Sequence, residues 1–258
     1  TQTHNLIKTE ALIFNLRNLY APSILEYNGI KRMWMGGWLT EADVGPDKIY
    51  YSEFINGVWT IPVLSFEKTG FHVNDPSVVQ PQDSDGIDRS NWLYMYYTAL
   101  SNEDAKNSRF NRHAVGFASS IDGGKSWTDN GIVIDPESSG DGAGAWAPSA
   151  IVVGDEIWVY YHTGTSDFSK PINFRIRFNL NGWQKLSSPE RLSFQDNSVL
   201  LSNLDVSRQG SQFVMVANTL DLKNIVRYVS ADGLNWVADP KNKNTIIAGN
   251  QNSVITPH

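Results

Sequence analysis

Short runs that alternate between apolar and polar residues follow one another along most of the chain. The clearest are four aromatic segments, at residues 31–38, 91–98, 156–164 and 212–219. Each follows a polar turn and precedes a second such run, at residues 48–54, 113–120, 173–179 and 224–231. A period of two in segments rich in aromatic and β-branched side chains predicts β-strands. No stretch keeps a 3.6-residue apolar period long enough to predict a helix.

The strand pattern is organised as a repeat with two landmarks. The first is a short frame that usually contains a proline: "YAPSIL" (20–25), "NDPSVV" (74–79), "WAPSAI" (146–151), "NLDVSR" (203–208) and "VITPH" (254–258). The second is a glycine followed closely by tryptophan: "NGVW" (56–59), "DGGKSW" (122–127), "NGW" (181–183) and "DGLNW" (232–236). The second landmark leads into a fourth strand, as at residues 59–66 and 131–136.

Four antiparallel strands repeated about every 50 to 70 residues are typical of the blades of a β-propeller. Four units are complete, and "NSVITPH" (252–258) reads as the first strand of another. We therefore expect an all-β fold: a five-bladed β-propeller with four complete blades and the start of a fifth. Either residues 1–20 return a strand to the fifth blade and close the ring, or the propeller is truncated. Residues 1–258 are expected to form a single domain.

Composition narrows the classes of partner. The chain of 258 residues has a net charge of −6, so it lacks the basic surface that nucleic acids or anionic membranes require. It has no cysteine, which fits exported bacterial proteins as well as cytosolic ones, and its first ten residues do not form a signal peptide. We expect a secreted or periplasmic monomer. No cofactor or metal is expected, because "DSDGID" (83–88) lacks the full pattern of a calcium loop.

The frame at the start of each first strand is where we look for chemistry. In a propeller these strands line the central channel, so residues at their starts converge from distant parts of the chain. The frame aligns Asp75 with Asp205, and it places Asn74, Trp146 and His258 near the same mouth. Two carboxylates across a polar, aromatic-lined pocket are what hydrolysis of a glycosidic bond requires.

The motifs "VNDPSVV" followed by "WLYMYYT", and "AWAPSAIV" followed by "EIWVYYHTG", resemble glycoside hydrolase family 43 and related five-bladed glycosidases. The resemblance implies that Asp75 is the catalytic base or nucleophile. It also implies an Asp that tunes the acid where this chain has Ser149, and a Glu acting as general acid near Asp205. We expect Asp75 and Asp205 to be the catalytic pair, with Ser149 contacting substrate and Trp146 as a stacking platform.

Other polar residues beside the frames have two interpretations each. Glu41 and Asp43 either line the pocket or belong to a solvated loop, and His162 either contacts sugar hydroxyls or closes a loop. Asp47 matches a position that the related glycosidases often keep, but it also suits a turn cap. His72 belongs either to the pocket rim or to the ordinary surface.

Three functions remain open on the sequence. The first is a glycosidase that cleaves an oligo- or polysaccharide, and the second is a glycan-binding propeller that has kept the pocket and lost the acid. The third is a sialidase, because "SIDGGKSW" (120–127) matches an Asp box and "SADGLNW" (230–236) a shortened one. We favour a structural interpretation of the Asp boxes, in which the Asp carboxylate holds its own turn together.

Overall fold

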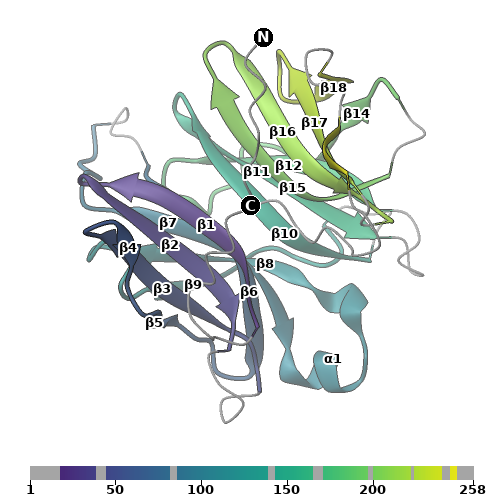
Figure 1. The fold of residues 1–258 in the computed structure, drawn as a ribbon. Helices are drawn as coiled ribbons and strands as arrows, with labels where there is room; N and C mark the ends of the chain where they lie inside the picture. The colour runs from purple at the N-terminus through teal and green to yellow at the C-terminus, as the bar shows by residue number, and fades with distance from the viewer. Residues whose placement is uncertain are drawn as a thin grey trace.

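The described part of the chain is a set of four sheets, antiparallel except for one short parallel pair. The computed structural model describes residues 18–38, 45–81, 86–138, 143–164, 171–196, 200–221, 224–239 and 245–248. These sheets follow one another as the blades of a β-propeller, each beginning at an inner strand (Figure 1). Within these residues no helix has the length and apolar character needed to cross a membrane.

Blades I and II are built in chain order. Blade I contains β1 (Leu19–Tyr27), β2 (Ile30–Gly37), β3 (Lys48–Ile55), β4 (Val58–Trp59) and β5 (Val63–Phe66). Blade II contains β6 (Phe71–Val79), β7 (Leu93–Ser101), β8 (Ala114–Ser120) and β9 (Thr128–Ile134).

Blades III and IV repeat this order. Blade III contains β10 (Ala143–Val153), β11 (Glu156–Gly164), β12 (Ile172–Asn179) and β13 (Glu190–Arg191). Blade IV contains β15 (Leu201–Gln209), β16 (Gln212–Thr219), β17 (Asn224–Ser230) and β18 (Asn235–Ala238). Two short strands join it: β14 (Ser193–Phe194) pairs in parallel with β18, and β19 (Thr245–Ala248) pairs with β17.

The all-β prediction and the strand pattern are confirmed. The expected strands at residues 156–164 and 212–219 coincide with β11 and β16. The predicted fourth strand at 59–66 is divided into β4 and β5 around Pro62, which has no N–H to donate to a ladder. The described residues contain four blades, and the expected start of a fifth at 252–258 lies outside them.

One short α-helix, α1 (Asn102–Lys106), lies between β7 and β8 in the described chain, followed by the 3₁₀ helix η2 (Phe110–Arg112). The apolar period could not predict it, because none of its residues is buried. The signal was local instead: the hydroxyl of Ser101 accepts a hydrogen bond from the N–H of Asp104 and so caps the first turn.

The apolar cores lie between blades rather than inside them. Inner strand β1 packs against β6, β6 against β10, and β10 against β15. One cluster joins aromatic side chains of blades I and II, such as Trp34 and Tyr97, and a second joins Tyr96 of blade II to Phe178 of blade III. A blade therefore buries its apolar face only when its neighbour is in place.

Hydrogen bonds also connect each blade to the next one. In blades I to III, a buried aromatic residue on the second strand donates to a glycine carbonyl in the outer turn of the next blade. These bonds are Trp34 Nε1 to Gly124 O (2.8 Å), Tyr96 hydroxyl to Gly182 O (2.8 Å) and Tyr160 hydroxyl to Gly233 O (3.1 Å). The accepting glycines all have left-handed φ, and a Cβ on Gly124 would lie 2.3 Å from the Trp34 ring.

The Asp boxes stabilise two of these outer turns, those of Gly124 and Gly233. The carboxylate of Asp122 accepts hydrogen bonds from the N–H groups of Lys125 (3.0 Å) and Ser126 (3.1 Å) and from the Ser120 hydroxyl (2.7 Å). Asp232 holds the shortened box in the same way, accepting from the N–H groups of Leu234 and Asn235. The carboxylates are thus bonded within their own turns, as the structural interpretation expects.

Removing one inter-blade donor should weaken the fold without changing its shape. Tyr96→Phe leaves the buried carbonyl of Gly182 without its partner, so we expect the free energy of unfolding to fall by about 1–2 kcal/mol in urea denaturation. Tyr160→Phe removes the equivalent bond at the next interface and should cost a similar amount. Unchanged stability in both variants would show that these bonds do not hold the blades together.

Candidate functional site

Every inner strand is interrupted near its start by a β-bulge. The pairing register shifts between Tyr20 and Ser23 in blade I, and at the equivalent place in the other blades. The residue in the bulge has left-handed backbone geometry in each case: Ala21 (φ 47°), Asp75 (45°), Ala147 (49°) and Asn203 (47°). Side chains other than glycine rarely adopt this conformation, so the surrounding structure must hold it.

The strand registers correct the expected alignment of Asp205. Ser149 pairs with Tyr160, two residues before His162, the partner of Trp146 at the start of the bulge. Asp205 has this same register in blade IV, opposite Val216. It therefore matches the serines that follow the prolines in the other frames: Ser23, Ser77 and Ser149.

The residue of blade IV that matches Asp75 is Asn203. The misalignment arose because blade IV has no proline in its frame, and Leu204 occupies the position that proline takes elsewhere. Asp75 and Asp205 thus stand at different depths along their strands. The expectation that they hold equivalent positions was wrong.

The serine positions form a chain of hydrogen bonds around the axis. Each serine hydroxyl accepts from a backbone N–H of the next inner strand: Ser23 from Val78 (3.0 Å), Ser77 from Ala150 (2.8 Å) and Ser149 from Val206 (2.9 Å). The last of these hydroxyls also donates to the Asp205 carboxylate (3.3 Å). A cavity of about 250 Å³ lies along this chain, lined by residues from all four inner strands.

Asp75 is half-buried at the bulge of β6. Burial raises the pKa of its carboxyl to about 6; a hydrogen bond from the Thr98 hydroxyl opposes the rise, and the charge of Asp47 adds to it. The same hydroxyl accepts from the N–H of Ala147 (2.8 Å), so Asp75 is tied to blade III through Thr98. Near neutral pH this carboxyl is therefore poised to gain or lose a proton.

A polar network from blades I and II surrounds Asp75. The amide of Asn74 donates to the hydroxyl of Tyr20 (2.9 Å) and, at 3.4 Å, to the carboxylate of Asp47. The N–H of Asp47 donates to Nδ1 of His72 (3.1 Å). Burial, followed by the charges of Asp47 and Asp75, raises the pKa of Tyr20 well above its ordinary value, so the phenol stays neutral.

Two oxygens in this network are buried, and no hydrogen-bond partner for them is found among the described residues: Asp47 Oδ1 and Asn74 Oδ1. A buried oxygen without a partner is costly, and such groups are usually satisfied by water or a ligand. Gly36 allows Asn74 to come this close to blade I, since a Cβ there would lie 2.9 Å from the Asn74 side chain. The network is suited to binding hydroxyl groups.

Blade III supplies an aromatic wall. Trp146 is half-buried between two imidazoles, its ring centre 5.1 Å from that of His113 and 5.1 Å from that of His162. His162 is buried, and its Nδ1 accepts from the N–H of Asn203 (3.4 Å), so it joins blade III to the bulge of blade IV. Burial lowers the pKa of His113, which is therefore neutral at pH 7.

The carboxylate that influences Asp75 is Asp47. Burial raises the pKa of Asp205 and the hydrogen bond from Ser149 opposes it; the charge of Asp75 is not among the causes. Conversely, Asp47 and not Asp205 raises the pKa of Asp75. The structure thus brings together Asn74, Asp75 and Asp47, with Tyr20 across from them. Asp205 and Ser149 form a second polar group further along the channel.

Some expected site residues lie outside the described residues: Glu41, Asp43 and His258. Three contributors were missed: Tyr20, Thr98 and His113. Tyr20 had a signal, because it stands in its frame where Asn74 stands in the next. Thr98 and His113 had none, since they reach the site only through the packing of blade II. Within the described chain no group of three His, Asp or Glu side chains is placed to hold a metal ion.

Comparison with known proteins supports the fold and leaves the activity open. No sequence-family model matches the chain, and no curated protein is similar to it in sequence. The structure is similar to a GH43_1 enzyme from Xanthomonas citri, with a TM-score of 0.64 and 11% identity over 91% of this chain and 76% of that one. This similarity supports a β-propeller fold for the described residues.

Two further solved structures, whose names give other enzyme classes, are also similar in fold. Zg3597, a family 117 glycoside hydrolase from Zobellia galactanivorans, has a TM-score of 0.64 and 16% identity over 87% of this chain and 73% of that one. The Hadza microbial sialidase Hz136 has a TM-score of 0.61 and 13% identity, over 86% of this chain and 46% of that one. At such identities the likeness establishes the fold alone, so the function must be argued from the site.

The raised pKa of Asp75 predicts a pH-dependent effect of Asp75→Asn on stability. Because the pKa is higher in the folded chain than in the unfolded one, the stabilising contribution of this carboxyl is fully present below pH 4 and is lost as the pH rises through 6. Asn is neutral and tolerates the left-handed backbone. We expect the stability of the variant relative to wild type to improve by about 2–3 kcal/mol between pH 4 and 7.5.

Thermal or urea unfolding at the two pH values measures this difference. Asp88→Asn is the matched control, because the pKa of this exposed Asp is lowered by hydrogen bonds from Ser90 and the sign of its effect is opposite. A stability difference for Asp75→Asn that does not change with pH would contradict the raised pKa.

Proposed function

We propose that the mouth of the channel binds a carbohydrate and that the protein cleaves O-glycosidic bonds there, with Asp75 as the catalytic base. The observation that carries the proposal is a carboxyl with a pKa of about 6, held at a strained bulge and surrounded by hydroxyl-binding groups. The glycoside hydrolase fold adds support. A general base works best with a pKa near the operating pH.

In the proposed reaction, the ionised Asp75 takes a proton from a water molecule, whose oxygen attacks the anomeric carbon. The bond from that carbon to the leaving oxygen breaks, and the leaving oxygen takes up a proton from an acid. Asp205 is the candidate acid, because burial raises its pKa and so keeps its proton to a higher pH. Because Asp205 lies further along the channel than Asp75, the leaving group must point inward to reach it.

The surrounding residues would orient the sugar. Asn74 and Tyr20 offer hydrogen bonds to hydroxyls, and the Trp146 indole offers an apolar face to a sugar ring. His162 fixes the orientation of that indole, and Ser149 orients the carboxyl of Asp205.

Asp75→Asn tests the assignment directly. Wild type and variant are assayed against aryl glycosides of neutral pentoses and hexoses and against plant and algal oligosaccharides. We expect the variant to lose about 10²- to 10⁴-fold in turnover, because the amide cannot accept the proton, while binding measured by calorimetry is retained. Asp88→Asn, an exposed carboxylate outside the site, should keep full turnover. Undiminished turnover in Asp75→Asn would refute its role as base.

The raised pKa also predicts the acid limb of the pH profile. Since Asp75 must be ionised to act as a base, kcat/KM should rise with pH and level off above about pH 6. A limb near pH 4 would mean that the base is an exposed carboxyl of ordinary pKa.

A non-catalytic glycan-binding propeller is the second candidate, and one observation favours it. The positions of blade IV that match Asn74 and Asp75 are Ser202 and Asn203, which cannot supply a proton as an acid. Binding by both wild type and Asp75→Asn, with no turnover by wild type on any probe, would support this candidate. The Asp boxes give the sialidase alternative no support, because their carboxylates are bonded within their own turns.

A further inference from the structure

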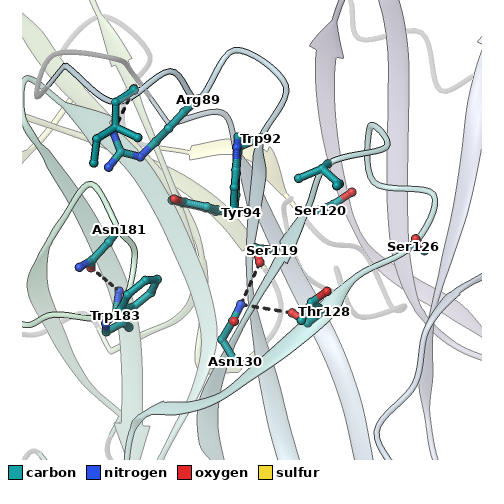
Figure 2. Close-up of a pocket in the computed structure, with 12 residues that line it drawn as sticks. Arg89, Trp92, Tyr94, Ser119, Ser120, Ser126, Thr128, Asn130, Asn181 and Trp183 are labelled. Carbon is teal, nitrogen blue, oxygen red and sulfur yellow. Dashed lines mark hydrogen bonds between the residues drawn. The ribbon is translucent and has the colours of Figure 1, made fainter.

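A second cavity lies on the far side of blades II and III. It has a volume of about 570 Å³ and opens between the outer turns of the two blades (Figure 2). Its lining comes from the start of β7, the end of β8, the Asp-box turn, β9 and the outer turn of blade III, and includes Arg89, Trp92, Tyr94, Thr128, Asn130 and Trp183.

This cavity is separate from the mouth of the channel. Tyr94 lines the cavity at the beginning of β7, whereas Thr98, which bonds Asp75, lies four residues later on the same strand. At roughly 3.3 Å per residue the two ends are about 13 Å apart along the strand alone. None of the residues that line the cavity belongs to the site around Asp75.

Two indoles from different blades border the cavity. Trp92 is 38% exposed and Trp183 is 55% exposed, although the chain buries other large aromatics such as Trp34 and Trp236 almost completely. Tyr94 is buried beneath them, 6.2 Å from the ring of Trp92 in an edge-on arrangement. Exposed tryptophans gathered at a cavity indicate a surface for a flat, partly apolar ligand.

Apart from Ile87 and Ile121, the rest of the lining is polar but carries little charge. The amide of Asn130 donates to the Ser119 hydroxyl (3.0 Å) and to the Thr128 carbonyl (3.2 Å), which holds its side chain at the wall (Figure 2). Arg89 is the charged residue of this lining; it is buried and donates to the carbonyl of Ile87 (3.4 Å). No carboxylate belongs to the lining among the described residues.

We propose that this cavity is a second carbohydrate-binding site, which holds an uncharged stretch of a glycan on the two indoles. A sugar ring has an apolar C–H face that fits against an indole, and hydroxyls at its edge that fit amides and hydroxyls such as those of Asn130 and Thr128. For an anionic ligand, this lining offers a single positive charge, the buried guanidinium of Arg89. The site would hold a chain on the face opposite the mouth, and it does not depend on any activity of Asp75.

Native gel electrophoresis in the presence of soluble polysaccharides tests the site. The probes are arabinoxylan, linear arabinan, agarose oligosaccharides and, as an acidic polymer, pectin. The variants are Trp183→Ala, Trp92→Ala and the double variant, with Trp59→Ala as the matched control on blade I, where this indole packs against Phe54. Trp146→Ala, which removes the indole wall of the mouth, separates binding here from binding at the mouth.

We expect at least one neutral polymer to retard wild type, Trp146→Ala and Trp59→Ala. Each single cavity variant should bind about tenfold more weakly, and the double variant should not bind. Trp183 lies on an exposed turn, so its single variant should fold normally, which circular dichroism verifies. If the enzyme is active, Trp183→Ala should cleave short aryl glycosides as fast as wild type does.

Three results would overturn the proposal: no retardation of wild type by any polymer, retardation by pectin alone, or equal retardation of wild type and Trp183→Ala. Loss of binding in Trp146→Ala with full binding in the Trp92 and Trp183 variants would assign all glycan binding to the mouth. Failure of hydrolysis in every protein would refute the proposed activity and leave this site intact.

Discussion

The hydrogen bond from one blade to a serine of the preceding blade is the contact on which the described structure depends. Ser23, Ser77 and Ser149 each accept a backbone N–H of the following inner strand close to the axis. At the outer edge, aromatic donors reach the turns of the next blade and complete the connection. With its core lying between blades, a blade has neither a closed core nor satisfied polar groups without its neighbour.

This arrangement explains how the mouth tolerates strain. Asp75 has a left-handed backbone before a proline, a combination that costs energy and needs support from several sides. Thr98 supplies this support to Asp75 from the neighbouring strand. The Thr98 hydroxyl also accepts from the N–H of Ala147, which links Asp75 to blade III. The bulge that builds the site is therefore stable only because the blades are locked together. The same packing removes Asp75 from water and raises its pKa.

The two ends of the blades carry different kinds of side chain. At the mouth, carboxyls and amides gather from blades I and II around Asp75, with an indole wall from blade III. At the opposite end, Trp92 and Trp183 stand on outer turns, where packing leaves indole faces open. This arrangement would suit a polymeric substrate. One part of the glycan would be cleaved at the mouth while another part is bound at the opposite surface.

Local pattern in the sequence determined the strands, the blade repeat and the Asp-box turns, and it singled out Asp75 as a candidate, because each depends on residues adjacent in the chain. The tertiary structure decided which groups meet. Blade IV lacks the proline that marks the frame, so only strand pairing shows that Asp205 matches Ser149 and that Asn203 matches Asp75. The influence of the Asp47 charge on the pKa of Asp75 and the cavity between Trp92 and Trp183 likewise involve residues of different blades. The two-residue period of a strand determines which face of the sheet a side chain occupies. The distance between residues of two blades depends instead on how the blades pack against each other.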